Sequence, residues 1–170
     1  MFELRIVQDE FPMSPDEWGD DCCFIIAKSE RELWIRGEED IEDYKDTHHI
    51  YPLFAYIHSG IALSLGREYP FNCKWDSGQI GYVLISKTEI SEPRKAAESL
   101  VEVWNSYLSG DVWGYEVIEK TECQCCNHIS EEVIESCYGF YSHETAENEG
   151  RMVLEVTERS HTPAQNQATL

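Results

Sequence analysis

Short apolar segments separated by turn-forming residues run through most of this chain, and their spacing limits the fold classes open to it. Phe2, Leu4 and Ile6 alternate with polar residues, whereas residues 22–27 form a continuous apolar run. The first pattern is typical of a strand with one face on a core, and the second of a buried strand. Similar patterns predict further strands over residues 50–57, 61–65, 79–86, 112–119, 133–141 and 152–157.

One segment instead follows the 3.6-residue period of a helix. Pro93 stands near its start, and Gly110 stands where a C-terminal cap belongs. The apolar positions between them are Ala97, Leu100, Val101, Trp104, Tyr107 and Leu108. We predict a principal amphipathic helix over residues 93–109 that packs its Leu100/Trp104/Leu108 stripe on the sheet. A short acidic helical segment is an option for residues 38–46. The expected fold class is α+β, with a mainly antiparallel sheet.

The length of 170 residues is typical of one domain. Residues 1–159 are expected to form a single acidic domain, and residues 160–170, which lack an apolar period, a flexible C-terminal tail. No basic segment followed by an apolar run opens the chain, and no stretch approaches the roughly 20 apolar residues of a membrane span. The sequence therefore predicts a cytoplasmic protein without a membrane partner, and it leaves the oligomeric state open.

Acidic residues strongly outnumber basic ones. There are 33 Asp and Glu against 13 Lys and Arg, which gives a net charge of -20. Hydrophobic residues make up 42% of the chain, which excludes a disordered acidic protein. Direct binding to nucleic acid is disfavoured, because phosphate is met by excess Lys and Arg. The charge favours a basic protein as the partner.

The acids flank a nearly neutral middle, residues 51–110, which contains 6 acids and 5 bases. We predict that two N-terminal segments form a partner-binding face. They supply Asp16, Glu17, Asp20 and Asp21 from a loop, and Glu38, Glu39, Asp40, Glu42 and Asp43 from the segment that follows. Twenty charges equal those on roughly one turn of duplex DNA, so such a face can present carboxylates where phosphates would sit. Trp18 and Trp34 would add apolar anchors. The alternative is that the acids only keep the protein soluble.

The residues of the neutral middle allow an alternative hypothesis, that the protein is a small hydrolase or transferase. His58, Cys73, Asp76 and Ser77 are the residue types from which a base, a nucleophile and an orienting acid are assembled. Cys73 or Ser77 would attack, His58 would take the proton and Asp76 would hold the imidazole. However, Asp-Ser-Gly is also ordinary turn chemistry, and no nucleophile-elbow spacing surrounds Ser77. The preferred assignment is a structural hairpin with Trp75 as a core anchor and no catalytic residue.

Seven cysteines in a chain expected to stay reduced indicate free thiols or metal ligands. Cys123, Cys126 and His128, with Cys137 or His143 as the fourth ligand, form the candidate set for tetrahedral zinc. No second C-x-x-C pair accompanies them. The preferred assignment is therefore no cofactor, with zinc as the alternative.

Several motifs occur in order from the middle of the chain onward. They are His58-Ser59-Gly60, Pro70-Phe71-x-Cys73-x-Trp75-Asp76-Ser77-Gly78-Gln79-x-Gly81, Tyr107-Leu108-x-Gly110-x-Val112-Trp113-Gly114-Tyr115 and Glu135-Ser136-Cys137-Tyr138-Gly139-Phe140-Tyr141. Over about residues 51–141 they resemble a family of uncharacterised proteins from bacteriophages and other mobile elements. The resemblance implies a host-cell setting and assigns no catalytic role.

In that setting, the expected function is anti-defence binding. The protein would block the basic, nucleic-acid-binding surface of a host defence or DNA/RNA-handling protein, such as a nuclease, as a nucleic-acid mimic. A structural or assembly protein is a further alternative, and it would expose a large apolar patch.

Overall fold

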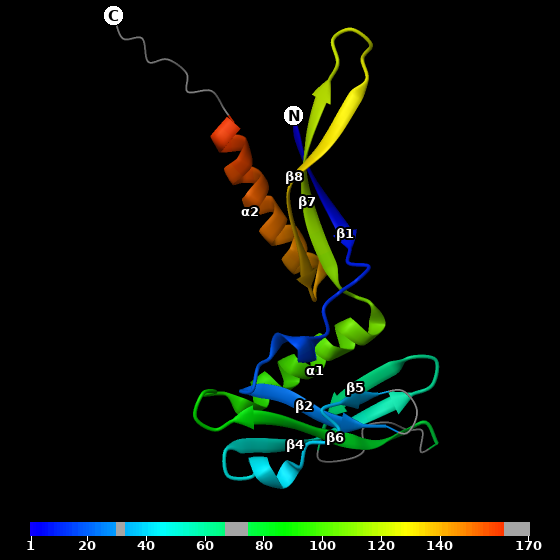
Figure 1. The fold of residues 1–170 in the computed structure, drawn as a ribbon, viewed down its shortest axis with the longest axis vertical. Helices are drawn as coiled ribbons and strands as arrows, with labels where there is room; N and C mark the ends of the chain where they lie inside the picture. The colour runs from blue at the N-terminus through cyan, green and yellow to red at the C-terminus, as the bar shows by residue number, and fades with distance from the viewer. Residues whose placement is uncertain (30–32, 67–74, 162–170) are drawn as a thin grey trace, which may run out of the picture. The chain divides into compact units, whose positions relative to one another are not determined.

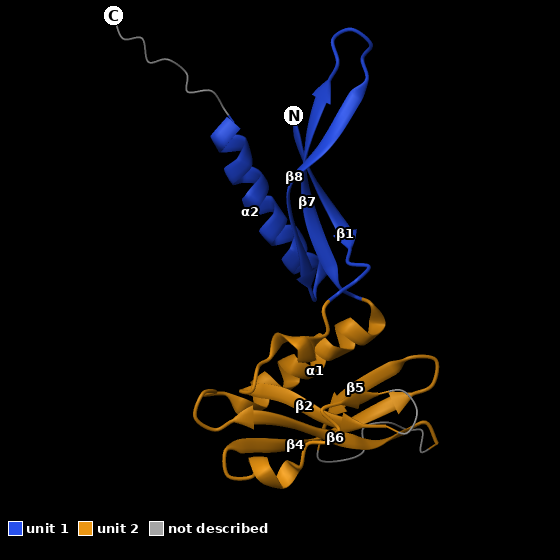
Figure 2. Ribbon diagram, viewed as in Figure 1, with its two compact units in different colours: residues 1–12, 111–170 blue, residues 13–110 orange. Residues whose placement is uncertain are grey.

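The computed structural model describes residues 1–29, 33–66 and 75–161 of the chain. The chain divides into two compact units: unit 1, residues 1–12 with 111–170, and unit 2, residues 13–110 (Figure 2). Within the described residues, each unit contains one antiparallel sheet and one α-helix (Figure 1), which confirms the predicted α+β class. A single domain over residues 1–159 stays a prediction.

Unit 2 contains a five-stranded antiparallel sheet in the order β3-β2-β6-β4-β5. Its strands are β2 (Cys23–Lys28), β3 (Trp34–Ile35), β4 (His48–Ile57), β5 (Ile61–Leu65) and β6 (Ser77–Ser86). The strands predicted over 22–27, 50–57, 61–65 and 79–86 are thus confirmed. The central strand β6 packs closely on β2 at Gly81, where a Cβ atom would lie only 1.9 Å from the carbonyl oxygen of Ile26.

Helix α1 (Pro93–Ser109) covers one face of this sheet and confirms the predicted principal helix. Val101 and Trp104 are buried against the strands, and Leu100 and Leu108 are partly buried beside them. Gly110 ends the helix with a φ of 74°, a left-handed conformation that glycine adopts without steric cost. The apolar stripe read from the sequence is therefore the face that builds the core of unit 2.

A side chain of α1 also pairs with the edge strand β5. The Asn105 side chain accepts a hydrogen bond from the Leu63 backbone N–H (2.7 Å) and donates one to the Leu63 carbonyl oxygen (3.0 Å). An amide side chain carries the same donor and acceptor as a peptide group. Asn105 thus takes the place of a neighbouring strand at this position, which protects part of an otherwise open edge.

Unit 1 contains a three-stranded antiparallel sheet in the order β1-β7-β8. β1 (Phe2–Gln8) pairs along its whole length with β7 (Trp113–Glu122), which pairs on its other side with β8 (Ile129–Phe140). These strands confirm the three predicted from the first residues and from 112–119 and 133–141. The N-terminal strand therefore joins a sheet whose other strands come from the last third of the chain.

The strand predicted over residues 152–157 is wrong. These residues lie in helix α2 (His143–His161), which packs on β1 and β7. Ser160 and His161, assigned from the sequence to a flexible tail, also belong to α2, and residues 162–170 lie outside the described residues. Neither α1 nor α2, the α-helices of the described residues, is long and apolar enough to cross a bilayer.

Small residues explain how α2 packs. Ala146 and Gly150 are its buried positions and lie one helical turn apart. A Cβ atom at Gly150 would lie 2.6 Å from Leu4 Cδ1 and 2.9 Å from Tyr115 Cβ. The helix thus approaches the sheet closely because it has no side chain at that point. The alternation of apolar and polar residues over 152–157 does not indicate this close contact.

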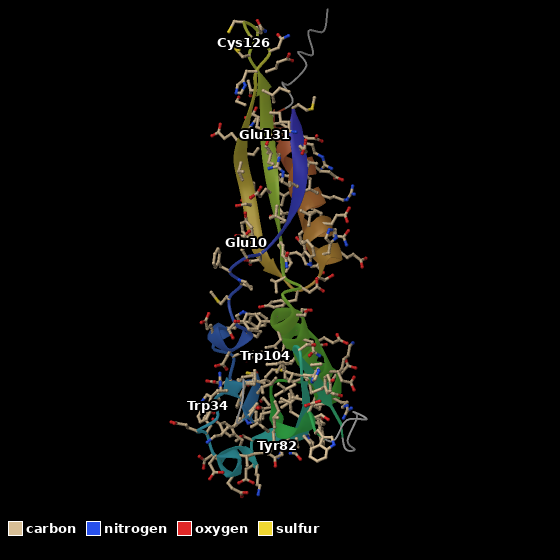
Figure 3. All side chains as sticks on the ribbon, turned by 90° about the vertical axis from the view of Figure 1, so that its right-hand side faces the viewer. Glu10, Trp34, Tyr82, Trp104, Cys126 and Glu131 are labelled. Atoms are coloured by element: carbon tan, nitrogen blue, oxygen red, sulfur yellow. The ribbon has the colours of Figure 1, made fainter. Side chains whose placement is uncertain are left out.

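Charged side chains join the three strands of unit 1. Arg5 of β1 donates a hydrogen bond to Glu131 Oε2 of β8 (2.9 Å), and Lys120 Nζ of β7 lies 3.2 Å from Glu131 Oε1. Glu131, labelled in Figure 3, therefore binds a cation from each of the other two strands. Hydrogen bonds from Arg5 and then from Lys120 lower the pKa of the Glu131 carboxyl below its usual value.

Candidate functional site

The first acidic segment of unit 2 is bound by an arginine that lies just before the second segment. Arg36 donates hydrogen bonds from Nε to Asp16 Oδ1 (3.0 Å) and from Nη1 to Asp21 Oδ1 (3.1 Å). Its guanidinium group also lies 4.4 Å from the centre of the Phe24 ring, and only 15% of its side chain is exposed. Partial burial opposes the charge, but hydrogen bonds to Asp21 and Asp16 leave the pKa of Arg36 raised. Arg36 is thus a fixed cation that anchors the first acidic loop.

The second acidic segment folds back onto the same part of the sheet. The helical segment suggested for residues 38–46 is only a single 3-10 turn, η2 (Ile41–Tyr44). Tyr44 donates a hydrogen bond to Glu39 Oε2 (2.7 Å), and its ring packs edge-on against Phe24 with 5.2 Å between ring centres. Both acidic segments are therefore fixed around Phe24.

His48 of β4 closes the junction between the segments. Its Nε2 atom lies 3.0 Å from the carbonyl oxygen of Asp21, and its ring packs edge-on against Tyr44 at 5.3 Å. Sequence reasoning missed the roles of Arg36, Tyr44 and His48. The one available signal was that Arg36 is the sole base between residues 33 and 44.

The nine predicted partner-binding acids all lie in these two joined segments, but several also have structural contacts. Asp16 and Asp21 bind Arg36, Asp20 accepts from the Cys22 N–H, Glu39 accepts from Tyr44, Asp40 caps η2 and Glu42 pairs with Lys45. Glu17, Glu38 and Asp43 are exposed, and their carboxylates have no polar partner among the described residues. The surface therefore combines fixed carboxylates with solvated ones.

The two predicted apolar anchors, Trp18 and Trp34, are both exposed in unit 2. The exposed fractions of Trp18 and Trp34 are 47% and 55%. Trp18 lines a shallow groove of about 270 Å³ beside α1, together with Leu100 and Val103. Lys28 Nζ lies 4.5 Å from the centre of the Trp34 ring. Both tryptophans therefore remain about half exposed beside these contacts.

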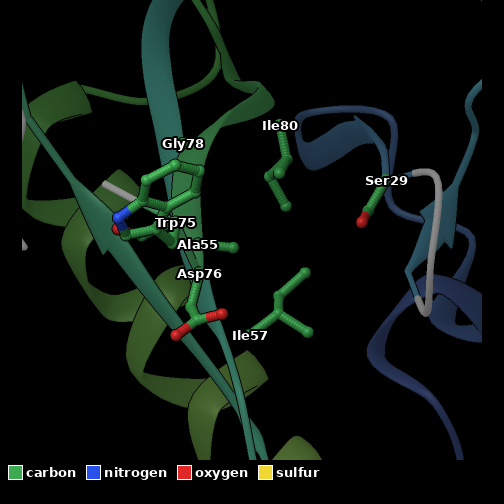
Figure 4. A pocket seen from close by; sticks show the side chains of 8 residues that line it. Ser29, Ala55, Ile57, Trp75, Asp76, Gly78 and Ile80 are labelled. Carbon is green, nitrogen blue, oxygen red and sulfur yellow. The ribbon is translucent and has the colours of Figure 1, made fainter. Parts of the chain in front are cut away.

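The candidate catalytic residues are only partly brought together. His58 Nδ1 lies 3.3 Å from Asp76 Oδ2, so the carboxylate orients the imidazole as the enzyme alternative requires. Asp76 and Ser77 line a cavity of about 240 Å³ at the start of β6 (Figure 4), and His58 does not line it. Cys73 lies outside the described residues. The described residues thus supply a base and its orienting acid, without a nucleophile placed against the base.

The same residues also have backbone roles in a hairpin. The Ile57 N–H donates to the Asp76 carbonyl oxygen (2.7 Å), and Ser77 pairs with Tyr56 of β4. Trp75 is 92% exposed, so the expectation that it anchors the core is wrong. Trp75 lies two residues before β6 begins and lines the same cavity as Asp76 and Ser77.

Three cysteines gather in the turn of the β7–β8 hairpin (Cys126 is labelled in Figure 3). The Sγ atoms of Cys123, Cys125 and Cys126 all lie within 4.8 Å of one another, and those of Cys123 and Cys125 are 2.9 Å apart. Hydrogen bonds from the thiol and backbone N–H of Cys125, followed by those of Cys126, lower the pKa of Cys123 to about 7. This cluster can hold a metal ion, because thiolate is the form of cysteine that binds metals.

The group of thiols that could hold a metal ion differs from the predicted ligand set. Cys125 joins Cys123 and Cys126, whereas Cys137 lies opposite Tyr115, seven residues along β7 from the hairpin end. At about 3.3 Å per residue, that separation is roughly 23 Å. His143 lies still farther along, with its ring 4.8 Å from that of Trp113. The sequence contained the C-x-C-C cluster, but the turn conformation decides which sulfurs meet.

Backbone geometry explains why the sulfurs meet. Asn127 has a φ of 56°, a left-handed conformation that asparagine tolerates, and its N–H donates to the Cys123 carbonyl oxygen (2.8 Å). The Cys123 N–H donates in turn to the His128 carbonyl oxygen (2.8 Å). These bonds curl residues 123–127 into one helix-like turn, so their side chains leave the same end of the hairpin.

Comparison with known proteins adds no functional assignment. No protein-family model, curated protein or solved structure matches this chain. The resemblance to bacteriophage and mobile-element proteins therefore stays a prediction. The candidate functional features of the chain are the acidic surface around Arg36 and the hairpin thiols.

Proposed function

We propose that the protein binds a basic protein surface through the acidic segments joined at Arg36. The partner is a host defence or nucleic-acid-handling protein in the cytoplasm, and binding covers the groove that would otherwise hold DNA or RNA. The observation that carries this proposal is the junction itself. Arg36, which lies two residues before the second acidic segment, binds Asp16 and Asp21 of the first loop, so it holds the two segments beside each other.

The charge and the exposed indoles support this mode of binding. Fixed carboxylates lose little conformational entropy when a partner binds, and solvated ones attract it over a distance. Trp18 and Trp34 supply the aromatic side chains that carry much of the affinity at protein interfaces. Carboxylates placed in the partner's nucleic-acid-binding groove would contact the same Lys and Arg side chains that the phosphates of DNA or RNA contact.

The test is capture of the partner from host lysate, followed by affinity measurements with the purified pair. The variant neutralises five acids (Glu38→Gln, Glu39→Gln, Asp40→Asn, Glu42→Gln and Asp43→Asn). The matched control neutralises five acids of α2 (Glu144, Glu147, Glu149, Glu155 and Glu158, each to Gln) and changes the net charge equally. We expect only the first variant to lose binding. Equal losses, or an affinity unchanged between low salt and about 0.5 M, would contradict the proposal.

We also propose that the hairpin thiol cluster holds zinc, because soft thiolates are preferred ligands of this ion. The supporting observation is that three sulfurs lie within 4.8 Å of one another. The measurement is the metal content of the reduced full chain after dialysis against zinc and then buffer. One zinc per chain is expected, and a content near zero would reject the proposal.

A further inference from the structure

The hairpin that carries the thiol cluster is closed by its own backbone. β7 and β8 pair up to Glu122 and Ile129, and two backbone hydrogen bonds of 2.8 Å then link Cys123 to Asn127 and His128. Structural zinc sites instead supply folding energy that their loops lack. An ion bound here would therefore add little to the stability of the hairpin, and its role would be to bind a further ligand.

The cluster has three donors and not four. Within the described parts of the chain, the His, Cys, Asp and Glu ligand atoms that form a metal-holding group are those of Cys123, Cys125 and Cys126 alone. Cys137 lies roughly 23 Å away along the strands. Three protein ligands with one open position are the arrangement of zinc sites that accept an outside ligand, whereas closed structural sites have four.

Charge decides which outside ligand fits best. Three thiolates around Zn²⁺ already leave one net negative charge, and the chain as a whole has a net charge of -20. A fourth thiolate would add a further negative charge to this field, whereas a neutral nitrogen donor adds none. Imidazole is the neutral donor that zinc meets most often in proteins.

We propose that the hairpin turn forms an open three-thiolate zinc site whose fourth position accepts an imidazole from outside the chain. The inference rests on the proposed zinc binding and extends it to the ligand set and the incoming donor. Because all three cysteines lie in an exposed turn, a histidine of a partner or a free imidazole can reach the ion.

The test uses the reduced full chain loaded with Co²⁺, whose visible spectrum reports on its ligands. One Co²⁺ per chain is expected, and added imidazole should shift the spectrum in a saturable way. Cys125→Ser should weaken Co²⁺ binding at least about tenfold, since even the loss of an outer-shell partner typically costs 10–100-fold. Cys137→Ser is the matched control, and it should bind Co²⁺ as the unaltered protein does.

His128→Ala separates an open site from one closed by the chain itself. The open site predicts an unchanged spectrum and an unchanged response to imidazole in this variant. A changed spectrum would identify His128 as the fourth ligand and overturn the inference, as would bound Co²⁺ that ignores imidazole. Absence of any bound zinc or Co²⁺ would instead reject the underlying zinc proposal.

Discussion

The two units place a helix on a sheet in opposite ways. Under α1, unit 2 buries Val101 and Trp104, so the helix contributes apolar volume to its core. Under α2, unit 1 buries only Ala146 and Gly150 from the helix, so close approach replaces volume. The comparison teaches that a helix need not have a broad apolar stripe to dock, provided that its partner strands supply the larger side chains.

The units also arrange their charges differently. Unit 1 has 15 acids and 4 bases, and each of its bases pairs with acids across the strands or one turn along α2. Unit 2 has 18 acids and 9 bases, and one partly buried base, Arg36, binds two acids of the first acidic loop, Asp16 and Asp21. Similar excess charge therefore gives dispersed pairs in one unit and an anchored surface in the other.

The largest expected effect on stability comes from removing Trp104, the largest buried side chain of α1. Trp104→Ala should lower the free energy of unfolding by about 3–5 kcal/mol, because it empties a large volume at a buried site. Denaturant unfolding followed by hydrogen exchange will show which amides lose protection. The exposed Glu102→Ala is the control and should change stability by less than about 0.5 kcal/mol. Loss confined to unit 2 is expected, and equal loss in β7 would instead support the single domain predicted from the sequence.

Adding a side chain at Gly150 tests whether α2 approaches the sheet of unit 1 closely at this position. Gly150→Val should cost about 1–3 kcal/mol of unfolding free energy, because its side chain would overlap Leu4 and Tyr115. Glu149→Val, at the neighbouring exposed position of the same helix, introduces the same residue without that overlap. Thermal unfolding of the two variants gives the comparison. A Gly150→Val protein as stable as the unaltered one would show that α2 does not dock as described.

Arg36→Ala sharpens the contrast between net charge and anchored charge. The variant is more negative by one charge, so recognition by net charge alone predicts tighter binding to the basic partner. We expect weaker binding, because Asp16 and Asp21 lose their anchor, and a loss of about 1–2 kcal/mol in stability. Arg151→Ala makes the same charge change on α2 and should leave partner affinity unchanged. Isothermal titration of both variants measures the difference.

The smallest expected effect concerns the charge pairs of unit 1. The folded pKa of Glu131 is lowered, so its stabilising contribution is complete above the ordinary value of 4.5 and is lost as the pH falls through the folded value. Glu131→Gln should therefore flatten the decline in hairpin protection between about pH 5 and pH 3. Amide exchange of β8 against pH is the measurement. An unaltered pH profile in Glu131→Gln would show that this carboxylate does not contribute to the protection of the hairpin.

The sequence identified the elements whose apolar pattern has one interpretation. The run at residues 22–27, the strand at 79–86 and the helix at 93–109 lie where periodicity predicts them. Residues 152–157 were misassigned because their alternation fits a strand. The helical signal lies in i,i+4 pairs such as Glu147–Arg151, whereas Gly150 is needed for packing on the sheet. Glycine is a poor helix former, so local propensity argued against the segment that packing requires.

The acidic residues of the candidate site could be predicted from the sequence, but their arrangement in space could not. The nine carboxylates are visible as residues, yet Arg36 and His48 can bind the first acidic loop beside the second only after β3 and β4 are placed in the sheet. In the same way, the C-x-C-C cluster is visible in the sequence. Cys125, and not Cys137, joins the thiols that could hold a metal ion, because Asn127 turns the backbone and the strand register places Cys137 far from the turn.

By itself, the sequence determined the fold class, the main strands, helix α1 and the excess of negative charge, since each follows from local period or from counting. The tertiary structure decided that the first strand joins the last third of the chain, that α2 is a helix, and which acids and thiols meet. The physical reason is that these features depend on contacts between residues far apart in the chain. Such contacts are set by packing and hydrogen-bond register, which no local pattern contains.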